Sequence, residues 1–458
     1  MRVVTNPVIA YALPCRPTAG RKSHPHHHEC ADRNQSRCVV DDVSLTVHDG
    51  QVVEQREVQE KIYTKQTLQL RIGQQLTMPP RLQLFMDIQI KEVSTKAEMR
   101  AFINFTDELY KDHPCFVPPL RFDEAATLSA RKNPAFDHCE ARYWLAYRNN
   151  KVVGRIAGII NNAYIEKWKN KYIRFGWVDF EDDVNISRLL LQQVENWARE
   201  KGLNAIHGPL GFTDLDHEGT LIEGFDQLGT MASIYNYPYY QDHFEKLGFV
   251  KETDWVEYQL TADEVIPERL VKLASVVERR LKLTVVRAKK SKEILPYGTA
   301  IFELINDAYS DLFGVTPLTR RQMDYYTKQY FSFMKVEYVT IIVDREGKLA
   351  AFGITMPSLS RALQKNRGRL LPFGFIPLLK AMKTNHRADL LMIAIRKDLQ
   401  GKGVNAMLMK ETYEAYLRNG VTTVETNHEL EDNTRVRSLW EGFNAVQHKR
   451  RRCFIRHF

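Results

Sequence analysis

The pattern of apolar positions divides the chain at Met86. Over residues 1–85 apolar residues show neither sustained alternation nor helical spacing, whereas residues 86–94 alternate as in a strand and residues 96–110 are spaced as in an amphipathic helix. We therefore expect residues 1–85 to be a disordered or non-native extension, with the folded protein starting near Met86.

Residues 86–262 show the pattern of one α/β unit. Asn149 and Asn150 separate two hairpin strands, and Gly202 follows a long helix in the position of a C-cap. The predicted elements are strands at 143–147, 151–160 and 175–180, a helix at 186–201, a strand at 205–208, a helix at 239–247 and a strand at 255–260.

Residues 263–458 repeat this order. We predict helices at 299–312 and 319–331, strands at 338–343, 349–355 and 390–395, a helix at 404–418, a strand at 422–427 and a final helix running into Gly442-Phe443. KLGF at residues 246–249 parallels WEGF at residues 440–443. A period of roughly 200 residues is typical of duplicated domains, so we expect an α/β (α+β) protein with domains at 86–262 and 263–458.

Composition limits the class of protein and its location but adds no further structural elements. Apolar residues at 44% and charged residues at 26% are ordinary for a protein with buried cores. The longest apolar run, residues 370–379, has about half of the roughly 20 residues that a membrane-spanning helix needs. The absence of a signal-peptide pattern and of CxxC pairs leads us to expect a cytoplasmic protein without disulfides. Four histidines and two cysteines in residues 24–38 match no recognised ligand spacing, so we expect no metal site.

A glycine-rich turn links the predicted strand 390–395 to the predicted helix 404–418. Its residues are Gln400, Gly401, Lys402 and Gly403. Glycines let the main chain approach an anion, and the free N–H groups and dipole of the helix N-terminus hold a pyrophosphate. The sequence therefore predicts an anion-binding turn here, to which Lys402 adds a positive charge.

This turn resembles that of the GNAT superfamily of acyl-CoA-dependent N-acyltransferases. The family signature is Gln or Arg, two residues, Gly, one residue, then Gly or Ala. Gln400 and Gly403 match it, whereas Asn405 takes the last position. Asn433 begins a helix that ends in Gly-Phe, as in the family. The resemblance implies a duplicated GNAT fold with two mixed sheets flanked by helices, an acyl-CoA donor and an amine acceptor.

The resemblance also implies roles for residues of the second half. Donor contacts are expected from Ile393, Ile395, Gln400, Gly401, Lys402, Gly403, Val404, Asn405 and Asn433. A main-chain N–H near Ile393 to Ile395 would stabilise the oxyanion, and Glu425 or His428 would act as base. Trp440 stands where the family often has an acidic Tyr, so that role is vacant or filled elsewhere.

The first half lacks the glycine turn. Residues 179–185 read DFEDDVN there, and four carboxylates would repel a phosphate, so we expect a single CoA site. A long polar loop in this half contains His217, Glu218 and Glu223, followed by Tyr235. These residue types suit amine recognition and proton transfer, and equally suit helix capping and interface packing.

A narrower resemblance covers Met86 to Phe458. VPPL at 117–120, the loop at 208–225 and PFGFIPLLKAM at 372–382 resemble a bacterial family of duplicated GNAT-like proteins linked to N-acylation of sphingoid bases in ceramide formation. This resemblance implies a long-chain acyl-CoA and a lipid amine.

A basic and apolar insertion is expected at 357–387. Residues 361–387 carry seven Lys or Arg and no acid around the apolar run, which suits peripheral contact with a membrane face or a tunnel for an acyl chain. A helix with a solvated basic face is the alternative. The run at 449–452 (KRRR) is expected to be solvated.

Two other functions stay open. Duplicated GNAT folds also occur in aminoacyl-tRNA-dependent transferases, and a basic insertion could hold RNA. The apolar run is mostly aliphatic, however, so we do not expect a nucleic-acid partner. Asn405 and Trp440 are also consistent with a catalytically inactive acyl-CoA-binding module.

Overall fold

The computed structural model describes residues 46–48, 51–53, 88–262, 265–331, 334–440 and 443–458. Residues 1–77 and 78–458 are separate units. In the first unit β1 (Thr46–His48) pairs antiparallel with β2 (Gln51–Val53). The other residues of the 1–85 extension, including the histidine and cysteine group, lie outside the described residues.

The first half of the large unit ends in a long strand. Thr95 and Glu98 form a capping box at the start of α3, and Asn149 and Asn150 adopt positive φ angles of 50° and 62° in the hairpin turn. The elements are β3 (Ile88–Glu92), α3 (Lys96–Leu109), α4 (Arg121–Thr127), β4 (Cys139–Arg148), β5 (Lys151–Asn161), α5 (Asn162–Trp168), β6 (Tyr172–Phe180), α6 (Val184–Glu200), β7 (Ala205–Gly208), β8 (Thr220–Glu223), α7 (Tyr239–Lys246) and β9 (Val250–Thr261).

The second half follows the same plan. Thr319 and Gln322 form a capping box at α11. The elements are α8 (Glu268–Leu281), β10 (Thr284–Val285), α9 (Ser291–Ile294), α10 (Gly298–Ala308), α11 (Arg320–Tyr330), β11 (Val339–Val343), β12 (Leu349–Pro357), α12 (Ser360–Asn366), α13 (Phe375–Lys383), β13 (Arg387–Ile395), α14 (Val404–Arg418), β14 (Thr423–Thr426), β15 (Glu429–Leu430), α15 (Thr434–Arg437) and β16 (Ala445–His457).

The α/β class and the duplicated order of elements are confirmed. Each predicted strand is present, and α14 begins and ends at the predicted residues. The predicted final helix is shorter than expected, because α15 ends at Arg437 and a 3-10 turn follows at Ser438–Trp440. Long elements that the pattern did not predict are α8, α13 and β16. Helices pack on both sheet faces: α6 and α3 contribute to separate cores of the first half, and α10 and α14 to separate cores of the second.

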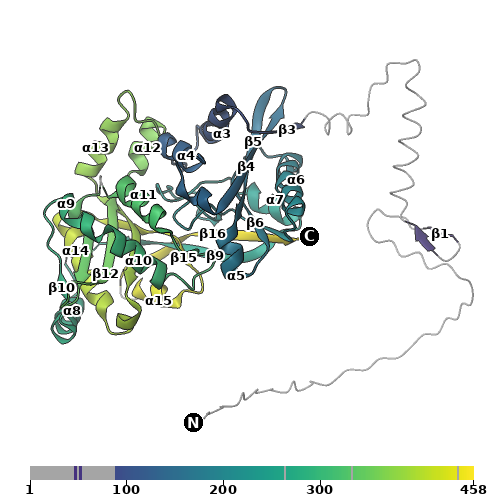
Figure 1. The fold of residues 1–458 in the computed structure, drawn as a ribbon. Helices are drawn as coiled ribbons and strands as arrows, with labels where there is room; N and C mark the ends of the chain where they lie inside the picture. The colour runs from purple at the N-terminus through teal and green to yellow at the C-terminus, as the bar shows by residue number, and fades with distance from the viewer. Residues whose placement is uncertain (1–45, 49–50, 54–87, 263–264, 332–333, 441–442) are drawn as a thin grey trace, which may run out of the picture. The chain divides into compact units, whose positions relative to one another are not determined.

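The two expected mixed sheets are joined edge to edge. The strand order is β10-β11-β12-β13-β14-β9-β16-β7-β6-β5-β4-β3, with β15 on β9 and β8 on β16. Two pairs are parallel, β13 with β14 and β6 with β7. The last strand of the first half, β9, pairs with β14, whereas the last strand of the chain, β16, pairs with β7. Each half therefore completes the sheet of the other (Figure 1).

The expectation that residues 449–452 are solvated is wrong. They belong to β16, and the alternation of the strand buries Lys449 and Arg451, each only 1% exposed. Arg451 Nε donates to Glu257 Oε1 at 2.5 Å, Lys449 Nζ lies 3.5 Å from Glu257 Oε2, and Lys449 also pairs with Glu425. These ion pairs compensate for the hydration that the two cations lose on burial.

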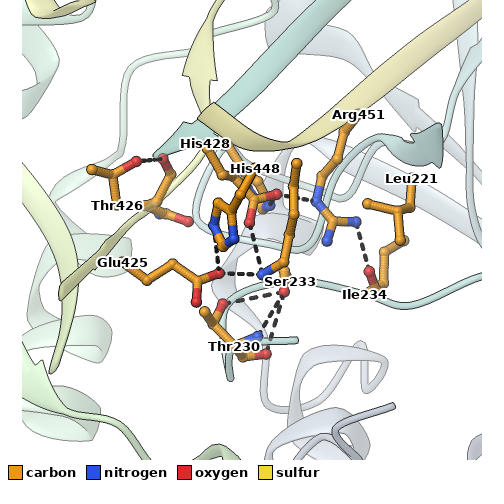
Figure 2. Close-up of polar contacts among 12 residues, drawn as sticks. Leu221, Thr230, Ser233, Ile234, Glu425, Thr426, His428, His448 and Arg451 are labelled. Carbon is orange, nitrogen blue, oxygen red and sulfur yellow. Dashed lines mark hydrogen bonds and ion pairs between the residues drawn. The ribbon is translucent and has the colours of Figure 1, made fainter. Parts of the chain in front are cut away.

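This buried network links the halves. Glu257 lies on β9 of the first half, while Lys449 and Arg451 lie on β16 and Glu425 on β14. Figure 2 shows Arg451 reaching the main chain of Ile234, whose carbonyl accepts from Nη1 at 2.6 Å. Burial favours the neutral form of Glu257, but the charges of Arg451 and Lys449 outweigh it and hold the pKa of Glu257 well below its usual range.

Removing one charge from this network should cost much stability. In Lys449→Met, Glu257 and Glu425 stay buried without their shared cation, so we expect the free energy of unfolding to fall by about 3–5 kcal/mol. Lys348→Met removes an exposed lysine that pairs with Glu346 and should change it by less than about 1 kcal/mol. Urea unfolding of both variants measures the difference, and equal small losses would show that the network does not hold the halves together.

Candidate active site

A cavity of about 300 Å³ lies between the two halves. From the second half, the cavity is lined by the C-terminal part of β13, by the segment after β14 and by α10. The first half lines it with α4 and with the loop between β7 and β8. The lining includes Asp123, Glu124, Trp177, Asp214, Asp216, His217, Glu218, Met231, Tyr309, Met356, Leu391, Ile393, Asn427, His428, Glu429 and Asn433.

The parallel strands β13 and β14 separate at this cavity. Their last paired residues are Leu390 and Thr426, after which the Asn427 N–H donates to the Leu390 carbonyl at 2.9 Å. From Leu391 to Ile395, β13 continues without β14 beside it. The Tyr309 hydroxyl donates to the Ile393 carbonyl at 2.7 Å from that side. The main chain of Ile393 therefore faces the cavity.

The glycine turn lies beyond the open end of β13. Gly401 and Gly403 have positive φ angles of 72° and 84°, which glycine adopts without strain, and a Cβ at Gly403 would lie 3.0 Å from Val277. Gln400 Nε2 donates to the Ile395 carbonyl at 3.0 Å and fixes the turn to the strand. In the described part of the chain, the N–H groups of residues 401 and 403–405 donate to no other group, so they are available to an anion.

Two cations stand beside these N–H groups. Lys402 is exposed on the turn itself. Arg435, on α15, donates to Gln400 Oε1 at 3.4 Å. Nothing in the local sequence marks Arg435, because only the fold brings α15 to the turn. Val404 is buried in the first turn of α14, and Asn405 is half-buried beside it.

Five carboxyl groups form the opposite wall of the cavity: Asp123, Glu124, Asp214, Asp216 and Glu218, called here the acidic wall. Burial raises the pKa of Asp123 and of Asp214 to about 6. It raises the pKa of Asp216 to about 7, and the neighbouring Glu124 and Asp123 add to that rise. Because neighbouring carboxylates repel one another, these groups favour a bound proton or a bound cation.

Glu218 is distinct within the acidic wall. The described residues offer its side chain neither a hydrogen bond nor an ion pair, whereas Glu124 accepts from Trp177 Nε1 at 2.7 Å and Asp216 accepts from the Phe212 N–H at 2.8 Å. Burial, followed by the charge of Asp214, holds the pKa of Glu218 well above its usual range. A carboxyl group with a raised pKa is a stronger base than an ordinary carboxylate, which suits proton abstraction from an amine.

The structure brings some of the predicted catalytic residues to the cavity. Glu218, His217 and His428 line it. His217 Nε2 lies 3.2 Å from the Met231 carbonyl. His428 Nε2 lies 3.4 Å from Glu257, but burial lowers the pKa of His428 and favours the neutral ring.

Three other predicted catalytic residues lie away from the lining. Glu425 pairs with Lys449 and lies 3.5 Å from His448 (Figure 2). Glu223 is exposed and pairs with Arg450 at 3.2 Å. The Tyr235 hydroxyl contacts His113 Nε2 at 2.9 Å in the core of the first half.

The structure adds a carboxyl group that the sequence analysis missed. Glu429 lines the cavity and accepts from Trp440 Nε1 at 2.9 Å. Burial raises the pKa of Glu429 to about 7. The tryptophan that replaces the expected tyrosine therefore holds a proton-carrying group. The adjacent acids Asp123 and Glu124, which follow VPPL after two intervening residues, are a sequence signal of this site.

Among the residues that the structure describes, two groups of metal-ligand types lie outside the cavity lining. His207, Glu252 and Cys453 contact one another, with His207 Nδ1 3.0 Å from Glu252. Glu257, Glu425 and His448 also cluster, but Lys449 sits between the two carboxylates, which disfavours a second cation there. The first group offers ligand types suited to zinc.

Comparison with known proteins agrees with this geometry. Residues 299–444, which include the open strand and the glycine turn, match the model of the acetyltransferase (GNAT) family. The chain therefore contains a GNAT domain and is an acyltransferase. Enzymes of this family use acyl-CoA as donor and an amine as acceptor.

Relatives align with both halves. The chain is 27% identical over 383 residues to the bacterial ceramide synthase of Caulobacter vibrioides, covering 80% of this chain and 97% of that one. It is 26% identical over 372 residues to the protein YghO of Escherichia coli, covering 80% and 94%. A solved tandem GNAT protein from the clavulanic acid pathway superposes with a TM-score of 0.47 at 14% identity, covering 81% of this chain and 98% of that one. Among the described residues, no helix has the length and apolar content to cross a membrane.

The acidic wall should make stability depend on pH. Because the folded state raises the pKa of Asp216 to about 7, the proton on Asp216 stabilises the fold at low pH. This contribution is lost as pH rises from the unfolded pKa of about 4 to the folded value. Asp216→Asn keeps an oxygen for the main-chain N–H groups but carries no charge. At about pH 8 we expect its free energy of unfolding to exceed that of the parent by about 1.4 kcal/mol or more over the difference found below about pH 4, where Asp216 is protonated in both states.

The check is chemical unfolding of both proteins across this pH range. Asp112→Asn, which changes an exposed aspartate, serves as control. An Asp216→Asn advantage that does not grow with pH would contradict the raised pKa.

Proposed function

We propose that this enzyme transfers a long-chain acyl group from acyl-CoA to the amine of a lipid, with a sphingoid base as the first candidate. One observation supports this most. The unpaired end of β13 lines the same cavity as the acidic wall of the first half, and the glycine turn follows directly after that strand. Donor and acceptor features therefore share one space.

The donor would bind along the second half. The N–H groups of residues 401 and 403–405, with Lys402 and Arg435, suit the pyrophosphate and phosphate of CoA. The pantetheine would follow β13 past Ile395 toward Ile393, which brings the thioester carbonyl to the open main chain. The Ile393 N–H would then stabilise the oxyanion of the tetrahedral intermediate.

The acceptor would bind at the acidic wall. A long-chain amine is an ammonium ion at neutral pH, and five carboxyl groups attract that charge. The ammonium must lose one proton before its nitrogen can attack, and Glu218 is the group with no competing contact. The nitrogen then attacks the thioester carbon to give a tetrahedral intermediate. This intermediate collapses to the amide as the carbon–sulfur bond breaks, and its second ammonium proton passes to an ionised carboxylate of the acidic wall.

The departing thiolate also needs a proton. Glu429, with its pKa raised to about 7, carries one in part of the molecules at neutral pH and faces the cavity from the donor side. We assign it the role that a tyrosine plays elsewhere in the family. Trp440, which donates to Glu429, would be a positioning residue.

The lipid acceptor has two supports. The relative from Caulobacter vibrioides is named a bacterial ceramide synthase. The cavity also has an apolar side, formed by residues such as Phe302, Phe313, Met231 and Leu391. Both fit a long-chain amine supplied from a membrane, so we place the working enzyme at the cytoplasmic membrane face.

Mass spectrometry of products tests the reaction. The purified protein, with acyl-CoAs of several chain lengths and amines including sphinganine, should yield an N-acyl amide from a long-chain donor. Gly401→Asp should reduce CoA binding and turnover by at least about 100-fold, because a carboxylate would face the phosphate. Gly347→Asp is the matched control, since both glycines have positive φ and open space around a new Cβ.

Absence of any amide from every long-chain donor would contradict the reaction. Unchanged CoA binding in Gly401→Asp would show that the phosphates bind elsewhere.

Replacing the proposed base should change the pH profile. Glu218 acts as a carboxylate, so its contribution to kcat/KM rises with pH through its raised pKa. Glu218→Gln should lower kcat/KM by about 10²–10⁴-fold and lose the rising limb that this carboxyl group produces. Glu303→Gln, on the exposed side of α10, is the control. A Gln variant that keeps the same rising limb would rule Glu218 out as the base.

A further inference from the structure

We propose that α12, α13 and the loop between them form a cap that docks on an anionic bilayer and opens the cavity toward it. The cap comprises residues 360–383. The docking partner is inferred from the surface itself, while the passage of substrate through the cap rests on the proposed function. Figure 1 shows α12 and α13 together at one end of the large unit.

The cap exposes large apolar side chains. Leu371 is 81% exposed, Phe373 71% and Leu379 64%, and Phe375 and Ile376 are exposed beside them. Five such residues within nine positions form an apolar tip that water solvates poorly. A bilayer can take up these side chains at its acyl boundary.

Positive charge surrounds this tip. Arg361, Lys365, Arg367, Arg369, Lys380 and Lys383 are all exposed, and none of them lies within 4.0 Å of a carboxylate of the described residues. No acid interrupts residues 361–387. Each Lys or Arg near an anionic membrane surface contributes about 1 kcal/mol, so the cap is complementary in charge to such a surface.

The inner side of the cap packs behind part of the cavity wall. Leu378, Ala381 and Met382 of α13 pack in one cluster with Met231, Met356 and Leu391. The last three residues line the cavity. The outer side of α13 therefore meets solvent while its inner side adjoins the proposed binding site. A shift of α13 would connect the bilayer with the cavity.

The base of the cap is fixed to the first half. Gln364 Nε2 donates to the carbonyls of Pro114 and Phe116 at 2.8 and 2.9 Å, and the Arg121 N–H donates to the Gly368 carbonyl at 3.0 Å. These contacts hold the apolar tip in a defined direction. They also place it next to α4, which carries Asp123 and Glu124 of the acidic wall.

Vesicle sedimentation tests the docking. The full chain should sediment with vesicles of phosphatidylcholine and phosphatidylglycerol and far less with phosphatidylcholine alone. Leu371→Glu with Phe373→Glu should weaken binding by at least about tenfold, because charge replaces apolar contact. Lys380→Glu with Lys383→Glu should do the same, because two cations that attract the anionic surface become acids that it repels. Val250→Glu, at another exposed apolar position, should bind as the parent does.

Several results would overturn the proposal. The first is that the parent protein does not sediment with anionic vesicles. The second is that the Leu371→Glu, Phe373→Glu variant sediments with them as fully as the parent does. A change in molar mass of that variant in solution would instead assign the tip to a second copy of the chain. Loss of RNA binding without loss of vesicle binding would assign the cap to RNA.

A water-soluble assay separates this proposal from the function. With octanoyl-CoA and a short-chain amine in the absence of vesicles, the cap variants should form amide at the parental rate. Vesicle binding without amide formation from any donor contradicts the function alone. Amide formation without vesicle binding contradicts the docking alone.

Discussion

The ion pairs of Lys449 and Arg451 with Glu257 and Glu425 are the contacts on which the architecture depends. These charges are buried where β9 and β16 cross from one half to the other, and buried charges are stable only when they are paired. Because each half completes its sheet with a strand of the other, neither half presents a finished sheet alone. The cavity lies beside this junction, and His428 contacts both the network and the cavity.

The two halves of the duplicated fold contribute different parts of one site. The second half keeps the separated strands and the glycine turn, which suit a thioester donor. At the corresponding turn of the first half, Asp179 forms an ion pair with Arg155 and accepts a hydrogen bond from the Tyr110 hydroxyl. That position therefore stabilises the core of the first half. The first half instead supplies the acidic wall from its long loop and α4. Opposite electrostatic characters on the two sides match a polyanionic donor and a cationic acceptor.

Periodicity and capping signals predicted most of the fold, because α14, β7 and the hairpin at Asn149 and Asn150 depend on local sequence. The joining of the sheets could not be predicted in this way. KRRR at 449–452 reads as a solvated run, and only its pairing with distant Glu257 and Glu425 makes its burial favourable. For the site, the glycine turn was evident from spacing, whereas Glu429 and Arg435 depend on contacts made by the folded chain.

On the proposed function, donor and acceptor meet in one cavity formed by both halves. A crystal structure with a non-reactive thioether analogue of a long-chain acyl-CoA tests this most directly. We predict its pyrophosphate at the N–H groups of residues 401 and 403–405, and its thioether sulfur in the cavity near Ile393, facing Glu218. A pyrophosphate bound at residues 179–185 of the first half, or an acyl chain that leaves the cavity empty, would contradict a shared site for donor and acceptor.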